Sequence, residues 1–152
     1  MFFLVGIDDT DTAAHEDTGP LAIRLGSLLQ ERRYASMLAV TRHRLLQHPD
    51  LPRTTSNNAV CILLDADSDR RRDIELTCRE FLLRQSAPSS EPGFAFAAWN
   101  TITYAIVEYG QLARLTILKR MSAVELAKTH GIAIAGFHAR GSGVIGALAA
   151  IG

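Results

Sequence analysis

The sequence predicts an α/β (α+β) protein with a mixed β-sheet packed against helices. Short apolar runs rich in β-branched and aromatic residues alternate with longer segments whose apolar residues recur every three or four positions. Their order begins strand, helix, strand, strand, helix, strand. This is a ferredoxin-like βαββαβ start, and extra helices and a final strand follow it. The 152 residues are 47% hydrophobic, enough for one core, so a single domain over residues 1–152 is expected.

The first half of the chain supplies the ferredoxin-like start. The apolar run from Met1 to Val5 is too short for a helix and predicts a buried strand, whereas leucines at helical spacing after Thr18 predict a helix packed on the sheet. Basic residues 42–44 are either the rim of a phosphate site or an exposed strand edge. The expected strands are residues 2–7, 35–44 and 59–64, and the expected helices are residues 18–33 and a segment from the acidic stretch 65–69 to about Gln85.

The second half is expected to add a short strand, two helices, a final strand and a C-terminal helix. A loop rich in Pro and Ser, residues 86–93, precedes them. Asn100 or Thr101 is a candidate N-cap for the first of these helices, and Gly131 is a stop for the second. The expected strands are residues 94–97 and 132–135, and the expected helices are residues 100–115, 122–130 and 144–151.

Composition narrows the class of protein. The formal net charge is zero, so the overall field does not attract nucleic acid, although local charge can still bind a nucleotide. Cys61 and Cys78 are too few and too far apart for a metal site or a disulfide framework, and buried thiols are expected. Neither a signal peptide nor a membrane-spanning stretch is recognised. We therefore expect no membrane partner and a cytoplasmic location.

Three carboxylates, Asp8, Asp9 and Asp11, stand directly after the opening strand. Carboxylates this close repel one another, so a fold that keeps them together favours a bound cation, and Mg²⁺ prefers oxygen ligands. Proteins usually hold Mg²⁺ with one or two carboxylates, together with phosphate oxygens and water. The cluster therefore predicts a metal site that binds a polyphosphate. The alternative is a solvated turn, since Asp and Thr are common in turns.

Two further segments are candidates for phosphate contacts. Thr18 is expected to cap the helix that follows, where backbone N–H groups attract phosphate oxygens, and Pro20 fits its first turn. The glycine-rich turn at residues 136–143 allows a ligand to approach the backbone closely, with Arg140 placed to reach a phosphate. A tight packing turn is the alternative, and the phosphate interpretation requires this turn to face Asp8.

Several motifs resemble, in chain order, the kinase-like N-terminal domain of the archaeal isoleucine-tRNA 2-agmatinylcytidine synthetase, a family with a GIDDTD motif. This chain resembles a stand-alone short homologue of that domain. The family uses ATP to activate the C2 carbonyl of an anticodon cytidine by phosphorylation, and agmatine then displaces the phosphate. The matching motifs are Gly6–Asp11, the helix opening at Thr18, His48–Pro52 before Asn57, and Gly143–Gly152.

The resemblance implies ATP and Mg²⁺ as cofactors and assigns roles to individual residues. Asp8, Asp9 and Asp11 would hold Mg²⁺ and the ATP phosphates, and together with Thr18 they form the expected catalytic set. The nucleotide contacts are expected at Gly6, Thr10, Gly19, Asn57, Arg140, Gly141, Ser142, Gly143 and Gly146.

The sequence also departs from the family pattern. Residues Arg53–Asn57 replace a Lys-Thr-Arg-Gly-Asn motif and lack one of its two basic side chains. Gly19 and Pro20 replace a Thr-Tyr pair. The OB-fold and zinc ribbon that help the synthetase grip tRNA have no counterpart in this sequence.

The sequence therefore predicts an ATP- and Mg²⁺-dependent phosphotransferase-like enzyme, related to the tRNA cytidine-activating kinase domain, whose acceptor it does not specify. The alternative is a non-catalytic nucleotide-binding or interaction module that acts with an RNA-binding partner subunit. The expected partners are a nucleotide and either RNA or such a subunit. A phosphatase of the haloacid dehalogenase type is suggested by Asp9-Thr10-Asp11, but Ala13 stands where that motif has Thr or Val.

Overall fold

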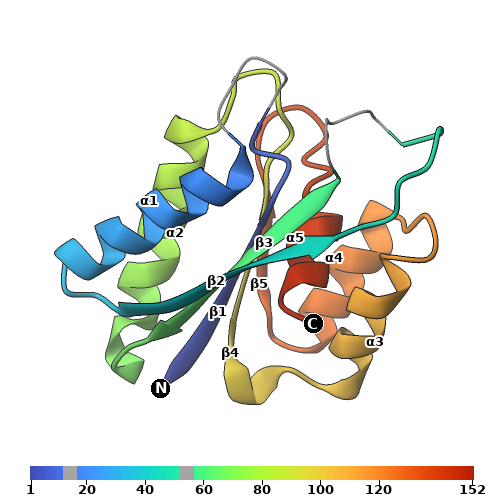
Figure 1. Ribbon diagram of the computed structural model, residues 1–152. Helices are drawn as coiled ribbons and strands as arrows, with labels where there is room; N and C mark the ends of the chain where they lie inside the picture. The colour runs from blue at the N-terminus through green and yellow to red at the C-terminus, as the bar shows by residue number, and fades with distance from the viewer. Residues whose placement is uncertain (12–16, 52–56) are drawn as a thin grey trace.

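A computed structural model describes residues 1–11, 17–51 and 57–152. Its strands form one sheet in the order β2-β3-β1-β4-β5, with β1 at the centre (Figure 1). The central strand is nearly all apolar because helices cover both of its faces. The strands are β1 (Phe2–Asp8), β2 (Ser36–Arg44), β3 (Asn58–Asp65), β4 (Gly93–Ala98) and β5 (Ala133–Gly136).

Helices pack on the two faces of the sheet and divide the core into two layers (Figure 1). One face carries α1 (Thr18–Glu31) and α2 (Arg71–Gln85), whose leucines and isoleucine pack on Phe3, Phe94 and Phe96. The opposite face carries α3 (Tyr104–Leu112), α4 (Arg120–Thr129) and α5 (Val144–Ala150). Both cysteines are buried and free, as the sequence predicted.

The expected α/β class and its ferredoxin-like start are confirmed, but the sheet is not mixed in strand direction. All four pairings between neighbouring strands are antiparallel. In this topology β3 lies between β1 and β2, and β1 lies between β3 and β4. The strands that α1 joins (β1 and β2) and those that α2 joins (β3 and β4) are therefore not neighbours, whereas β4 and β5, which α3 and α4 connect, pair antiparallel.

Two expected helix starts are wrong. The N-cap of α1 is Asp17, and Thr18 is already the first helical residue. The N-cap of α3 is Thr103, because a 3₁₀ turn at Trp99–Thr101 precedes the helix. The end of α4 is as predicted: Gly131 follows the C-cap His130 and has a φ of 65°, which glycine adopts without strain. Among the described residues, no helix is long and apolar enough to cross a membrane.

Gly6 is a packing position at the centre of the sheet. A Cβ at this residue would collide with the carbonyl oxygen of Ala147 in α5, which lies directly against β1. We expect Gly6→Ala to lower the free energy of unfolding by about 3 kcal/mol, measured by urea denaturation, because backbone atoms cannot yield as a flexible side chain can. Gly131→Ala is the control, since it meets open space and costs only the strain of a positive φ, about 1 kcal/mol. Equal losses in the two variants would contradict this account.

Candidate functional site

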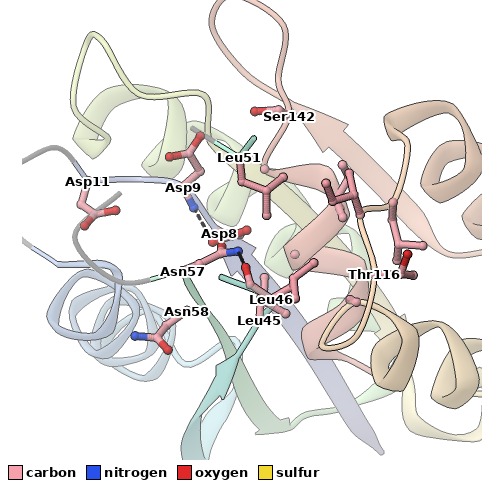
Figure 2. Close-up of a pocket in the computed structure, with 16 residues that line it drawn as sticks. Asp8, Asp9, Asp11, Leu45, Leu46, Leu51, Asn57, Asn58, Thr116 and Ser142 are labelled. Atoms are coloured by element: carbon pink, nitrogen blue, oxygen red, sulfur yellow. Dashed lines mark hydrogen bonds between the residues drawn. The ribbon is translucent and has the colours of Figure 1, made fainter. Parts of the chain in front are cut away.

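A cleft of about 170 Å³ opens where β1 ends (Figure 2). It lies between the acidic turn after β1, the connection from β2 to β3, the connection from α3 to α4, and the start of α5. One wall is apolar and is made of leucine and isoleucine side chains. The polar side chains of the cleft come from Asp8, Asp9, Asp11, Asn57, Asn58, Thr116 and Ser142.

Asp8 stands at the last position of β1 and faces the start of α5. The backbone N–H of Asp9 donates a hydrogen bond to Asp8 Oδ1 over 2.8 Å, and Asp9 has a φ of 54°, a conformation that Asp tolerates better than most residues. Asp8 Oδ2 lies where a Cβ of Gly146 would be, so that glycine leaves the space which the carboxylate fills. The turn thus directs Asp8 into the cleft rather than along the strand.

The pKa values of the three carboxyls are raised by their surroundings. Burial, and then the charge of Asp9, raise the pKa of Asp8 well above its usual range. Burial and the charge of Asp11 raise the pKa of Asp9 to about 6, and burial also raises the pKa of Asp11. None of the three forms an ion pair with a described Lys, Arg or His side chain. A cation in the cleft would therefore favour the ionised carboxylates.

These shifts have a consequence for stability. The folded-state pKa of Asp9 lies above its ordinary value of 3.8, so between pH 3.8 and about 6 the folded protein binds more protons than the unfolded chain. The free energy of unfolding should then fall as pH rises through this interval, by about 2 kcal/mol in the presence of EDTA. Urea unfolding across the interval checks this, with Asp9→Asn as the reference that removes the contribution. A difference between the two proteins that is flat, or that grows in favour of the wild type, would contradict it.

The glycine-rich turn lies on the same side of the molecule as the acidic turn, as the phosphate interpretation requires. Ser142, Gly143 and Gly146 line the cleft together with Asp8. The backbone of Gly143 is so close to that of Gly93 and Asp8 that a Cβ would meet their atoms within 2.8 Å. Figure 2 shows Asp8 and Asp9 near the centre of the site, Ser142 above them, and Asp11 farther out.

Several predicted site residues lie outside the lining of the cleft. Thr10 and Thr18 are buried, and the Thr10 hydroxyl donates to Thr18 Oγ1 over 2.9 Å. Gly6 packs against α5, and Gly19 faces the guanidinium of Arg42. Gly141, with a φ of 58°, packs on Gly136, and Arg140 also lies outside the lining.

Asn57 lines the cleft and is held in place by its side chain, which donates to the carbonyl oxygen of Leu46. The altered residues 53–56 and Ala13 lie outside the described residues. The basic end of β2 is an exposed strand edge, and residues 42–44 lie outside the lining of the cleft. β2 is an edge strand, and Arg42 pairs with Asp17 at the start of α1, with 2.6 Å between Nη2 and Oδ2.

Glu91 is a residue near the site that sequence reasoning missed. Its Oε2 accepts a hydrogen bond from the backbone N–H of Ser142 over 3.3 Å, and its carbonyl oxygen accepts one from Gly143 over 3.0 Å. An interaction with the Glu91 backbone acts to lower the pKa of Asp9, against the larger effect of burial. No motif signalled this role. The available clue was position, because Glu91 directly precedes a strand that pairs with the end of β1, with Asp8 opposite Gly93.

The carboxylate oxygens at the cleft suit Mg²⁺ only if the protein supplies some of the ion's ligands and leaves its other positions open. Carboxylate oxygens are the ligands this ion prefers, and Asp8 and Asp9 present them at the cleft. Within residues 1–11, 17–51 and 57–152, no three His, Cys, Asp or Glu side chains are grouped so as to hold a metal. The residues therefore fit an ion held by one or two carboxylates, with its remaining positions left for phosphate oxygens and water.

Comparison with solved structures gives strong matches for this arrangement. The crystal structure of apo TiaS, a tRNA agmatidine synthetase, has a TM-score of 0.81 at 24% identity, covering 99% of this chain and 35% of that chain. The crystal structure of TiaS in complex with tRNA and ATP has a TM-score of 0.83 at 24% identity, with 99% and 36% covered. The chain shares its fold with part of TiaS.

The complex of TiaS with tRNA, AMPCPP and agmatine gives the same result, with a TM-score of 0.82 at 24% identity, covering 100% of this chain and 36% of that chain. This chain thus spans about a third of the length of the TiaS chains that it matches. No known family matches the sequence in a scan of family descriptions, and no curated protein matches it.

Proposed function

We propose that the chain is an ATP- and Mg²⁺-dependent phosphotransferase whose nucleotide site is the cleft at the end of β1, within one domain of residues 1–152. The observation that carries this proposal is the set of three carboxylates that line one cleft with Ser142 and Gly143. They have no described cationic partner, and their pKa values are raised. In such a site, a cation that binds together with a polyphosphate would stabilise the ionised carboxylates.

Each wall of the cleft has a part in this proposal. Asp8 and Asp9 would hold the ion, which when bound would neutralise charge on the phosphates. Asp11 stands farther out and adds negative charge to the entrance (Figure 2). The apolar wall, with Leu45, Leu46, Ile117, Leu118 and Ile145, suits the flat apolar face of a nucleobase. The chain's own groups would therefore bind and orient the nucleotide. Phosphoryl transfer depends mainly on such positioning.

The fold supports this choice of ligand. The matched TiaS structures include complexes with ATP and with AMPCPP, each with tRNA bound. We take the acceptor to be a group on RNA, presented either by this chain or by an RNA-binding partner subunit, and we expect the protein to act in the cytoplasm.

Nucleotide titration tests the proposal. Calorimetric titration with AMPCPP should show binding in the presence of Mg²⁺ and at least tenfold weaker binding in EDTA, because the carboxylates then repel the phosphates. AMP should bind weakly under both conditions, since it lacks the phosphates that the ion would bridge. Equal affinity for AMPCPP with and without Mg²⁺ would remove the ion from the proposal, and absence of binding would overturn it.

A second candidate is a nucleotide-binding module without turnover that works beside an RNA-binding subunit. It is favoured by the segment Arg53–Asn57, which lacks one of the two basic side chains of the family motif that it resembles. Mg²⁺-dependent binding of ATP without ADP release, over a panel of RNA and small-molecule acceptors, would support this candidate. Phosphoryl transfer by the isolated chain would exclude it.

A further inference from the structure

The loop between α2 and β4 joins the two halves of the site through its backbone. At one end, the N–H of Ala87 donates to the carbonyl oxygen of Thr10 in the acidic turn over 2.9 Å. At the other, the carbonyl oxygen of Pro92 accepts from Phe137 over 2.8 Å, at the start of the glycine-rich turn. The acidic and glycine-rich turns are far apart in sequence, so this loop helps to set their relative position.

Glu91 makes the most connections within this loop. Its carboxylate accepts a hydrogen bond from the backbone N–H of Ser142 over 3.3 Å, and interactions with Ser142 and Arg140 lower the pKa of Glu91. Its carbonyl oxygen accepts a hydrogen bond from the backbone N–H of Gly143, and its backbone lies beside the Asp9 carboxyl and acts to lower the pKa of Asp9. One residue therefore contacts both the carboxylate wall and the glycine wall of the cleft. The Ser142 N–H, in the turn that sequence reasoning assigned to a phosphate, therefore donates to the chain's own carboxylate.

We propose that Glu91 is a positioning residue, which fixes Ser142 and Gly143 opposite Asp9 so that the cleft is formed before a nucleotide enters. The inference rests on the proposed nucleotide site. Without this acceptor, the Ser142 N–H would turn toward water, and Gly141 and Gly143 would allow the backbone to follow. A competing arrangement has Glu91 as an internal substitute for a phosphate, which the nucleotide must displace.

Two substitutions separate these arrangements. Glu91→Gln keeps an oxygen that can accept from Ser142, and Glu91→Ala removes it. Glu80→Ala, at an exposed residue of α2, is the matched control. For AMPCPP with Mg²⁺ we expect wild-type affinity within about threefold for Glu91→Gln and Glu80→Ala, and affinity on the order of tenfold weaker for Glu91→Ala. Unchanged or tighter binding by Glu91→Ala would overturn the proposal, and so would an equal loss in Glu91→Gln.

Hydrogen exchange keeps this test independent of the proposed function. In the nucleotide-free protein, the Ser142 amide should exchange about tenfold faster in Glu91→Ala than in the wild type or Glu91→Gln, whereas amides of β1 should be unchanged. The same exchange rate at Ser142 in all three proteins would overturn the positioning role, whatever the nucleotide result. Absence of nucleotide binding by the wild type would overturn the proposed function, and the exchange rates would still decide whether Glu91 fixes the turn.

Discussion

Replacing Asp8 with asparagine is expected to weaken binding of AMPCPP with Mg²⁺ on the order of a hundredfold. Asn has nearly the same shape and can still accept the hydrogen bond from Asp9, so the turn after β1 should keep its conformation. What is lost is the negative charge that faces the cleft, and a metal–carboxylate interaction in such a site is worth several kcal/mol. Calorimetric titration at pH 8, where the carboxyls of the wild type are more fully ionised, measures the effect.

The chain offers a matched control for this variant. Asp67 belongs to the acidic stretch at residues 65–69, which follows β3 at the end of the sheet opposite the cleft, since Asp65 pairs with Phe2. Asp67→Asn changes the net charge by the same amount and should leave nucleotide affinity within about twofold of the wild type. If the two variants lose affinity equally, the loss is caused by the change in overall charge, and Asp8 makes no specific contribution to nucleotide binding.

Gly146→Ala is expected to destabilise the protein by about 2 kcal/mol, although alanine normally stabilises a helix relative to glycine by up to about 1 kcal/mol. The reason is the contact between α5 and the acidic turn, where an added Cβ would collide with Asp8 Oδ2. The carboxylate would have to leave its position, so Mg²⁺-dependent nucleotide binding should weaken as well. Urea unfolding and calorimetric titration of the variant measure the two effects.

A double-mutant cycle identifies the cause. In an Asp8→Ala background the carboxylate is gone and the main remaining neighbour is Cδ1 of Leu45, the end of a flexible side chain. Gly146→Ala should then cost little or stabilise the helix, giving a coupling energy of about 2 kcal/mol. A cost that is the same in both backgrounds would mean that the glycine is required for packing within α5 and not for room beside Asp8.

The features that the sequence predicted well are local ones. The strand ending at Asp8 and the acidic turn that follows are set by adjacent residues, an apolar run and then three carboxylates. The same holds for the stop at Gly131, where a positive φ selects glycine. The N-cap prediction for Thr18 was wrong because a good N-cap residue can have another role. The Thr18 hydroxyl oxygen accepts a hydrogen bond from the Thr10 hydroxyl, and Asp17 occupies the N-cap position.

What the sequence did not predict depends on contacts between distant segments. The strand directions follow from β1 and β3 each lying between two other strands, which periodicity within one strand does not reveal. The phosphate interpretation required the glycine-rich turn to face Asp8, and it is the pairing of Gly93 with both Asp8 and Gly136 that places it there. Glu91 was missed for the same reason, because its partners lie in segments about 50 and 80 residues away in the sequence.

The most direct test is a crystal structure of this protein with AMPCPP and Mg²⁺. The account expects one ion with an Asp8 oxygen and a phosphate oxygen among its ligands, each at about 2.1 Å, with the nucleobase against the apolar wall of the cleft. A nucleotide bound elsewhere, or one bound in the cleft with Asp8 making no contact to an ion, would contradict it.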